Sequence, residues 1–370
     1  MKEYRIAAIG FAHSHIDGNI RDFAACKCRV KCVAAADIKP KVPSISKEHG
    51  TRIAEYKKAV EMYGFKPYGE DYLKLLDENE IDIALVCCEN AFHPFVSEEL
   101  LRRGIHVVLE KPLAADMEGA MRIARASREK GAKVFTNWPS AWSPAVRTAK
   151  ALCDKGEIGR LFKFTFRNSD SQGALSYGQK ITDAEKGREW WHQSDAGGGA
   201  LLDYCCYGAC MSGWFLNDKP AAAYGLKANF DSPYAGAEDY ATITVRFPKA
   251  AAILEGSWTT VNSGVPNGPV IFGTEGTIVV KNDIVEVYKT RHTDKPDKIV
   301  TADPLPAGRE DLGKEVLHHL DTGGELFPML DLPLNLQAMS ILDAGSRSAV
   351  SGKMELIRDG TWCIGDGNYN

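Results

Sequence analysis

A lysine at the end of an apolar run is the first feature of this chain that could do chemistry. The run Val107-Val108-Leu109 leads into Glu110-Lys111-Pro112 and then into a long helical pattern. This predicts a strand that ends in a turn fixed by proline. In an open α/β sheet, ligands bind in the crevice outside the carboxyl ends of the strands. Lys111 could therefore donate to a substrate hydroxyl or, if desolvated, act as an acid or base. The alternative is a surface lysine in a βα loop.

A tight turn after the first strand is the second such feature. Ile6-Ala7-Ala8-Ile9 is followed by Gly10-Phe11-Ala12-His13-Ser14-His15, and a second strand, 30–36, ends at Asp37. This is the layout of a dinucleotide-binding βαβ unit, with a helix N-terminus for the pyrophosphate and an acid for the ribose. The glycine pattern is incomplete, because Ala12 takes the second glycine position and His15 the third. His15 either loosens the packing of helix on strand or reaches toward the ligand.

Asp37 bears on which dinucleotide could bind. It lies at about the expected spacing of 20 residues beyond the turn. A carboxylate there favours NAD, because it would repel the 2′-phosphate of NADP. Lys39 lies two residues further on, so NADP is not excluded. Alternatively, Asp37 only caps a turn before Pro40.

The elements that must position these residues alternate over the first part of the chain. Strands are expected at 6–9, 30–36, 81–87, 107–109 and 132–136, with helices near 46–63, 71–78, 94–103 and 117–130. Short loops between alternating elements predict a doubly wound parallel sheet. We therefore expect an α/β Rossmann domain over residues 1–136.

After Asn137 the pattern changes. A helix at 144–155 precedes alternating strands at 161–167, 240–247 and 252–258 and a hairpin of 277–280 with 284–288. Strands with a period of two and no intervening helices predict a large open, mainly antiparallel sheet. Helices return near 310–320 and 335–351. The second domain is expected to be α+β and to span residues 137–370.

Composition narrows the class of protein. A hydrophobic content of 44% and a charged content of 25% are typical of a soluble globular protein. The net charge of −4 gives no basic footprint, so nucleic acid and membranes are not expected partners. No apolar run approaches the roughly 20 residues of a membrane span, and the N-terminus leads directly into a strand without room for a signal peptide. The ten cysteines suggest reduced thiols and a cytoplasmic location.

Glu110-Lys111-Pro112, with Asn90 and His93 upstream and Gly197-Gly198-Gly199-Ala200-Leu201-Leu202-Asp203 downstream, resembles the Gfo/Idh/MocA oxidoreductases. The resemblance spans nearly the whole chain. It implies an NAD(P)-dependent enzyme that acts on sugars, cyclitols or their derivatives. Together with the βαβ layout, it places the dinucleotide against one set of residues: Gly10, Phe11, Ala12, His13, His15, Asp37, Cys88, Asn90, His93, Glu110 and Lys111.

The resemblance also implies the catalytic residues. Lys111 would lie beside the nicotinamide and the substrate hydroxyl, and Asp203 would be the second polar group at the reacting centre. The family's usual histidine four residues later is here Tyr207, as in the glucose–fructose oxidoreductase branch, where the phenol acts as acid and base. Residues four apart share a helix face. A free phenol has a pKa near 10, so Tyr207 could be a base only if Lys111 lowered that pKa. Tyr207 could instead pack in a helix core.

Several positions depart from the family's pattern. Cys205 replaces the usual glycine between Asp203 and Tyr207, and Ala141 stands where many members carry arginine. The two histidines of the phosphate turn are also unusual. No metal is expected at the cysteines Cys205, Cys206 and Cys210, because zinc sites usually need a second ligand pair elsewhere in the chain.

Candidate substrate-binding residues are Arg167, Trp190, Trp191 and His192. The Trp-Trp-His run lies just before the glycine triplet, so the fold would bring it near Asp203. Aromatic faces stack on the C–H faces of a sugar, and Arg167 at a strand end could bind hydroxyls or a carboxylate. Alternatively, the two tryptophans lie in the core or at a subunit interface.

The leading hypothesis is hydride transfer between a nicotinamide and a hydroxyl-bearing carbon of a sugar, glycoside, sugar acid or cyclitol. Lys111, Tyr207 and Asp203 would handle the hydroxyl proton. One alternative is an enzyme that cleaves glycosides by transient oxidation with tightly bound NAD. Another is a sensor that binds a sugar or dinucleotide without catalysis. The free face of the second sheet is expected to pair with another subunit in a homodimer or homotetramer.

Overall fold

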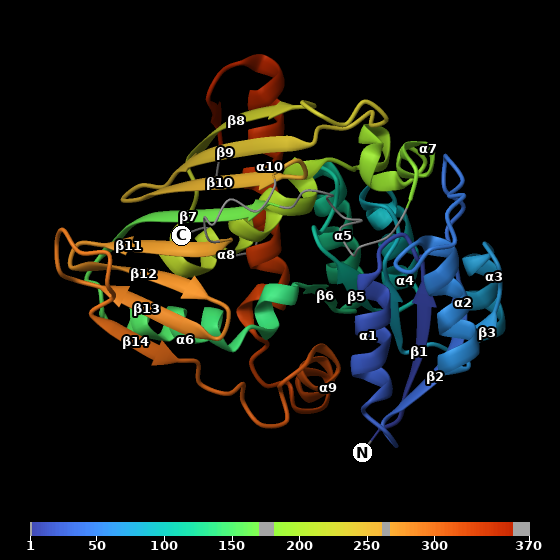
Figure 1. Cartoon of the computed structure of the whole chain (residues 1–370). Coiled ribbons are helices and arrows are strands. Elements are labelled where there is room, and N and C mark those ends of the chain that lie inside the picture. The colour runs from blue at the N-terminus through green and yellow to red at the C-terminus, as the bar shows by residue number, and fades with distance from the viewer. Residues whose placement is uncertain (1, 170–180, 261–266, 358–370) are drawn as a thin grey trace.

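The computed structural model describes residues 2–169, 181–260 and 267–357. Two sheets lie side by side in it (Figure 1). We call the part built on the first sheet the first lobe and the part built on the second sheet the second lobe.

The first sheet is parallel and carries the apolar runs of the N-terminal part of the chain. Its strands run in the order β3-β2-β1-β4-β5-β6, and all their pairings are parallel. The order reverses between β1 and β4, where a doubly wound sheet opens its binding crevice. The strands are β1 (Tyr4–Ile9), β2 (Val30–Ala36), β3 (Lys66–Pro67), β4 (Ile83–Val86), β5 (His106–Glu110) and β6 (Val134–Asn137).

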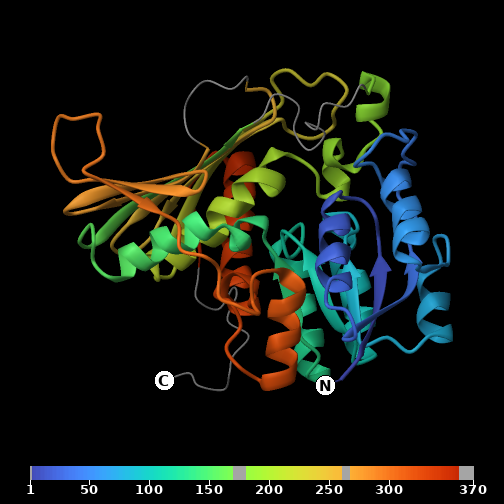
Figure 2. The same ribbon diagram turned by 60° about the horizontal axis from the view of Figure 1, so that its bottom comes forward.

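Helices cover this sheet on both sides, as the views in Figures 1 and 2 show. Asp71 and Asp116 begin two of them by accepting hydrogen bonds from backbone N–H groups. The doubly wound parallel sheet is confirmed. The helix expected from residue 46 begins only at Arg52, after an irregular stretch. The helices are α1 (His15–Ala24), α2 (Arg52–Tyr63), α3 (Tyr72–Glu78), α4 (His93–Arg102) and α5 (Met117–Lys130).

The second sheet is large and mainly antiparallel, as expected. Its order is β14-β13-β12-β11-β7-β10-β9-β8-β15. The central pair β7–β10 is parallel, and the other pairings are antiparallel. The strands are β7 (Leu161–Ser169), β8 (Ala222–Ala228), β9 (Tyr240–Arg246), β10 (Ala251–Ser257), β11 (Gly268–Gly273), β12 (Gly276–Lys281), β13 (Ile284–Tyr288), β14 (Lys298–Thr301) and β15 (Glu355–Leu356).

One face of the second sheet is packed against helices. Figure 2 shows α6 (Pro144–Asp154), α8 (Cys206–Leu216) and α10 (Leu332–Ser351) below the sheet. The remaining α-helices of the described part are the short α7 (Asp183–Lys186) and α9 (Leu312–Thr322). Helix α9 packs on α1 of the first lobe: a Cβ added at Gly313 would come within 2.5 Å of the Asp22 carbonyl oxygen. The domain boundary at 136/137 stays a prediction, and residues 1, 170–180, 261–266 and 358–370 of the two predicted domains lie outside the described part.

The other face of the second sheet carries side chains in register across several strands. Tyr224 lies opposite Thr244, which lies opposite Ile253, and the row continues to Thr165 and Val270. Tyr224 and Ile253 are 46% and 42% exposed. We call this surface the open face.

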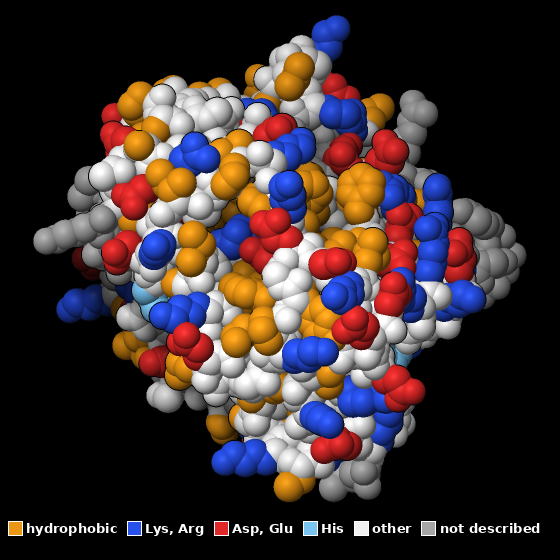
Figure 3. Space-filling view, turned by 90° about the vertical axis from the view of Figure 1, so that its right-hand side faces the viewer, with side chains coloured by type: hydrophobic (Ala, Val, Ile, Leu, Met, Phe, Trp, Pro, Cys, Tyr) orange, Lys and Arg blue, Asp and Glu red, His pale blue; other side chains and the backbone are white. Residues whose placement is uncertain are grey.

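The outer surface of the first lobe has a mixed charge. On the side shown in Figure 3, acidic and basic side chains are interspersed, without a continuous basic area. Such a surface does not have the one-sided positive field that nucleic acids require. Among the described residues, no helix is long and apolar enough to cross a bilayer.

Candidate active site

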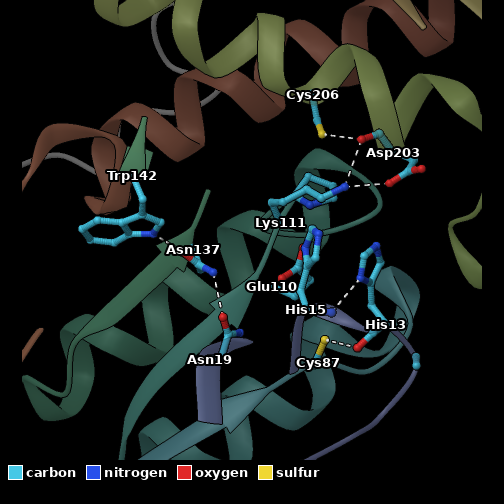
Figure 4. A network of polar contacts seen from close by, with 12 residues as sticks. His13, His15, Asn19, Cys87, Glu110, Lys111, Asn137, Trp142, Asp203 and Cys206 are labelled. Carbon is cyan, nitrogen blue, oxygen red and sulfur yellow. Dashed lines mark hydrogen bonds and ion pairs between the residues drawn. The ribbon is translucent and has the colours of Figure 1, made fainter. Parts of the chain in front are cut away.

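Polar side chains gather where β1, β4 and β5 end. Gly10 follows β1, Cys88 lies two residues after β4, and Glu110 and Lys111 lie at the end of β5. These carboxyl strand ends face the N-terminal part of α8 from the second lobe. The site therefore forms at the junction of the two lobes, as Figure 4 shows.

A buried ion pair connects the lobes at this junction. The Lys111 ammonium lies 2.6 Å from Asp203 Oδ1 and 3.0 Å from the Asp203 carbonyl oxygen. Both side chains are almost fully buried. Removing either partner would leave the other charge buried and uncompensated, which is costly.

A π-helical segment presents Asp203. Residues Leu201–Cys205 form this π-helix directly before α8, and such segments pair each N–H with the carbonyl five residues back. The Asp203 carbonyl oxygen accepts from Lys111 and also from the Cys206 thiol at 3.1 Å. The plain α-helical spacing expected for Asp203 and Tyr207 is therefore wrong, although both side chains still meet Lys111.

The glycine triplet allows the chain to enter this segment. Gly199 has φ of 110°, which favours glycine, and a Cβ added at Gly198 would lie 2.3 Å from the Trp191 carbonyl oxygen. A Cβ added at Gly197 would meet the Asn90 Cβ at 2.8 Å. The triplet thus lets the second lobe come close to the first.

Tyr207 lies against Lys111, but not in the way that a tyrosine base requires. The Lys111 ammonium lies 4.9 Å from the centre of the Tyr207 ring, a cation–π contact. The ring stacks on Phe166 and meets Trp138 edge-on. Burial raises the pKa of the phenol and outweighs the lowering by Lys111. Lys111 does act to lower the pKa of Tyr207, but the condition for a tyrosine base is not met, because desolvation of the phenolate is the larger effect.

Lys111 also keeps its proton. Burial alone would lower the pKa of its ammonium, but Asp203 and the other surrounding groups outweigh it and raise that pKa above its ordinary value. At neutral pH, Lys111 and Tyr207 are both hydrogen-bond donors.

Two buried acceptors at the junction lack a partner. Asp203 Oδ2 and Glu110 Oε2 make no hydrogen bond within the described part of the chain. Buried polar atoms are normally hydrogen-bonded. These two oxygens could therefore accept from a ligand's donor groups.

The phosphate turn fits a dinucleotide. Gly10 has φ of 80°, and a Cβ added there would lie 2.7 Å from the Cys88 backbone nitrogen and Cβ. Ser14, the N-cap of α1, makes no side-chain cap hydrogen bond. The first three backbone N–H groups of α1 donate within the turn, to His13 Nδ1 and to the His13 and Ser14 carbonyl oxygens, and the helix dipole favours an anion at this end.

Asp37 lies at the end of β2, where a ribose-binding acid is expected. Its Oδ1 accepts from the Phe11 and Ile38 N–H groups and pairs with Arg52 at 2.6 Å. Arg52 also pairs with the buried Glu89. A cavity of about 310 Å³ adjoins Asp37; its lining includes Pro40, Arg52, Ile53, Tyr56 and Gly69. Its size and its place beside Asp37 are compatible with a nucleoside.

The two histidines of the turn contact one another and Glu110. His15 Nδ1 lies 2.8 Å from Glu110 Oε1, and the His13 and His15 ring centres are 4.0 Å apart. The backbone N–H of His15 donates to His13 Nδ1 at 3.1 Å. The sequence left open whether His15 loosens the packing of helix on strand or reaches toward the ligand. In the structure its side chain faces the carboxyl ends of the strands, where a ligand is expected. Its pairing with Glu110 was not predicted, because these residues are far apart in the sequence.

Other residues predicted to bind the cofactor have structural partners. The Asn90 amide donates to the Gly197 carbonyl at 2.8 Å. The His93 ring is fully buried between the carbonyl oxygens of Pro112 and Cys88, at 3.1 and 3.2 Å. Burial lowers the pKa of His93 to about 4, so its ring is neutral. Asn90 joins the lobes, and His93 connects the ends of β4 and β5.

The Trp-Trp-His run is buried rather than open to a sugar. Trp190 Nε1 donates to the Ala12 carbonyl oxygen at 2.6 Å, so the second lobe covers the phosphate turn. Trp191 lies edge-on to His13, and His192 packs against Tyr234 and Trp258. The core alternative thus describes both tryptophans. Within the described residues, Trp191 Nε1 and His192 Nδ1 are buried without partners.

Arg167 does not join this group. Its neighbour Phe166 stacks on Tyr207, and successive side chains of a strand point to opposite faces. Arg167 accordingly pairs with Glu255 of β10, the residue opposite it, on the open face. The expectation that Arg167 binds substrate in this cleft is corrected by this placement.

Comparison with known proteins points to one family. Residues 36–138 match the model described as "Oxidoreductase family, NAD-binding Rossmann fold". Residues 146–279 match the model described as "GFO/IDH/MocA C-terminal domain".

Two of the curated relatives are named for reactions of sugar derivatives. A dTDP-3,4-didehydro-2,6-dideoxy-alpha-D-glucose 3-reductase of Actinomadura kijaniata is 29% identical over 51% of this chain and 56% of its own length. A 1,5-anhydro-D-fructose reductase of Ensifer adhaerens is 28% identical over 56% of this chain and 60% of its own length. The matches thus span little more than half of each relative.

Solved structures share the fold over nearly the whole chain. A levoglucosan dehydrogenase in complex with NADH and L-sorbose superposes with a TM-score of 0.76, 19% identity and coverage of 97% and 100% of the two chains. A dehydrogenase from Bordetella pertussis in complex with NADH and UDP-GlcNAcA superposes with a TM-score of 0.74 and 20% identity, and the match covers 96% of this chain and 99% of that one.

Proposed function

The chain belongs to the GFO/IDH/MocA family of oxidoreductases, and from this premise we propose that it is an NAD(P)-dependent dehydrogenase or reductase of a sugar or sugar derivative. The observation that carries the proposal is the buried Lys111–Asp203 pair at the strand ends. A lysine beside unpartnered carboxylate oxygens can bind a polyhydroxy compound. The sugar substrates of the two curated relatives support the same class.

The reaction has separate contributions from cofactor and protein. A bound nicotinamide accepts or supplies the hydride, and the protein contributes binding and orientation. Lys111 donates a hydrogen bond to the oxygen of the reacting carbon, which stabilises negative charge on that oxygen. Asp203 keeps Lys111 in place through Oδ1 and offers Oδ2 to a second hydroxyl. The ring of Tyr207 supports the ammonium through the cation–π contact.

For the cofactor, we propose NAD rather than NADP. Asp37 and Glu89 share Arg52, so the only guanidinium beside the Asp37 cavity among its lining residues is already paired with two carboxylates. It is not free to bind a 2′-phosphate, and the Asp37 carboxylate would repel one. We expect a lower Kd for NADH than for NADPH, measured by fluorescence titration.

The activity test uses both reaction directions. The purified chain is incubated with NAD⁺ and levoglucosan, D-glucose or myo-inositol, and with NADH and 1,5-anhydro-D-fructose, while the absorbance of reduced nicotinamide is recorded. We expect turnover with at least one of these compounds or a close relative. Absence of any redox turnover over the whole panel, with both dinucleotides, would contradict the proposal.

Lys111→Ala tests the residue that carries the proposal. We expect kcat to fall by about 10²–10³-fold, the range for loss of a hydrogen-bond donor to a developing negative charge, while the Kd for NADH changes little. Lys133→Ala is the matched control, because it removes an exposed lysine next to β6 at the opposite end of the same sheet. Near-wild-type turnover of Lys111→Ala would exclude the role.

We also propose that the open face binds a second copy of this chain. Tyr224, Leu226 and Ile253 are each more than 40% exposed there, and threonines and valines lie between them. Contiguous apolar surface of this kind is uncommon on monomers and is usual at the self-complementary interface of homo-oligomers. Arg167 and Glu255 would lie within such an interface.

A further inference from the structure

The cleft holds an acid–base pair that the proposed mechanism does not use. His15 comes from the N-terminus of α1 and Glu110 from the end of β5, and they meet at 2.8 Å. Glu110 is 2% exposed, whereas the His15 side chain is 22% exposed. A buried carboxylate that accepts from Nδ1–H fixes the ring's orientation and its tautomer. The lone pair of His15 Nε2 then remains free to accept a proton.

The oxidation needs such an acceptor. When a hydroxyl-bearing carbon loses hydride, its O–H proton must pass to a base. Lys111 and Tyr207 cannot serve at neutral pH, because the pKa of each lies above its ordinary value and each therefore keeps its proton. Asp203 is already bound to the Lys111 ammonium. Histidine is the side chain that most often serves as a general base in enzymes, and His15 lies in the same cleft.

His13 is set up for a different task. Its Nδ1 accepts a hydrogen bond from the backbone N–H of His15. Burial, followed by the effects of His15 and Lys111, lowers the pKa of His13 well below its ordinary value. The ring is therefore neutral, with its proton on Nε2. Such an imidazole donates a hydrogen bond and does not accept a proton.

The same geometry bears on a metal ion as an alternative. His13, His15 and Glu110 have ligand atoms within 4.8 Å of one another, as the ligands of a divalent cation would. However, metal binding needs an unprotonated ring nitrogen. Nδ1 of His13 is occupied by an N–H donor and Nε2 carries the proton, so His13 offers no free lone pair. The side chains favour a proton-transfer pair over a metal centre.

We propose that His15 is the general base of the oxidation, with Glu110 as its positioning residue and His13 as a neutral hydrogen-bond donor beside it. This rests on the proposed function. The C–H bond of the substrate breaks and its electron pair leaves as hydride to the nicotinamide. The O–H proton passes to His15 Nε2, and the C–O single bond becomes a carbonyl. In the reduction, the same proton returns to the alkoxide oxygen.

Charged and titratable groups lie near the His15–Glu110 pair, since Glu110 acts on Lys111, Cys206 and Tyr207. Glu110 is the last residue of β5 and Lys111 follows it, and His13 belongs to the phosphate turn. Asp203, Cys206 and Tyr207 come from the second lobe. Figure 4 shows the His15 ring between Glu110 and Lys111, pointing toward the second lobe.

A pH profile of kcat tests the base. For the wild type, with NAD⁺ and the best substrate of the panel, kcat should rise with pH as the base loses its proton. His15→Gln should lower kcat by at least about 100-fold and remove that rise, with the Kd for NADH within about threefold. Glu110→Gln should displace the rise, because an amide no longer stabilises the imidazolium. His318→Gln, on α9, is the control for loss of an imidazole.

Tautomers provide a readout that needs no turnover. Long-range ¹H–¹⁵N spectra of histidine-labelled protein, assigned with the His13→Gln and His15→Gln variants, should show the proton on Nδ1 of His15 and on Nε2 of His13. The opposite tautomer at His15 overturns the proposal even if the enzyme is active. A wild-type pH profile in His15→Gln overturns it as well. If no sugar is oxidised, the proposed function fails, and the tautomers alone decide whether the His15–Glu110 pair exists.

Metal analysis distinguishes the proposed base from a metal ion bound by His13, His15 and Glu110. Protein purified without chelator and dialysed should contain less than about 0.1 equivalent of zinc, manganese or iron, and EDTA should leave kcat unchanged. A stoichiometric metal that His15→Gln removes would overturn the assignment of His15 as a base.

Discussion

At the scale of single residues, contacts between distant parts of the chain form the site. Lys111 stands out in the sequence because a strand, an acid and a proline surround it. The structure brings Lys111, Asp203 and Tyr207 together as the resemblance implied, and their roles stay predictions. The His15–Glu110 pair has no local signature, since 95 residues separate its members. The one signal in the sequence was a large residue, His15, at a position where the dinucleotide-binding pattern has glycine.

Gly10 and Gly104 form a matched pair for testing the phosphate turn. Both have φ near 80°, but a Cβ at Gly10 would collide with Cys88, whereas one at Gly104 would meet nothing within 4 Å. We expect Gly104→Ala to cost about 1–2 kcal/mol of unfolding free energy from backbone strain alone. Gly10→Ala should cost about 1–3 kcal/mol more through overpacking and should weaken NADH binding. Urea denaturation and fluorescence titration measure both. Equal losses in the two variants would contradict the close approach.

At the scale of elements, large apolar runs could be read from the sequence, and small-residue packing could not. Strands β4 and β5 were predicted because buried valine, leucine and isoleucine fill them. Strand β8 was missed because its inward residue is Gly225, which packs directly on the Gly345 backbone of α10. Packing of backbone on backbone leaves no apolar side chain to recognise. The π-helix was missed for a related reason, since no residue type specifies that hydrogen-bond register.

His93, at the start of α4, makes the stability of this element depend on pH. Its pKa of about 4 in the folded state lies below the ordinary value of 6.5. Between these two pH values the unfolded chain binds more protons, so the free energy of unfolding falls as pH is lowered through that window. The full effect is about 3 kcal/mol, complete below about pH 4.

The variant His93→Gln isolates this contribution, because glutamine does not titrate. We expect a smaller loss of unfolding free energy between pH 7 and pH 5 than in the wild type, whatever the variant's stability at pH 7. His192, whose pKa is also lowered to about 4, should account for part of the dependence that remains. Identical pH dependence of wild type and His93→Gln would show that His93 is not neutral in the folded protein.

At the scale of the whole molecule, the open face should determine the state of assembly. Ile253→Lys adds a charge in the middle of the cross-strand row, and burying that charge at an interface is costly. We expect the variant to dissociate at protein concentrations where the wild type is a dimer or larger, as measured by light scattering. Met62→Lys is the control, because Met62 is 70% exposed on α2 of the other lobe. A monomeric wild type would contradict this assignment.

The bond from the Trp190 indole to the Ala12 carbonyl has a kinetic consequence. It closes one side of the turn where a dinucleotide's phosphates would rest, and the Asn90 amide holds the same two lobes together nearby. We expect the coenzyme to leave only when these two contacts between the lobes break, so its residence time depends on how often they break. A molecule enclosed in this way can pass through successive oxidation and reduction without leaving the protein.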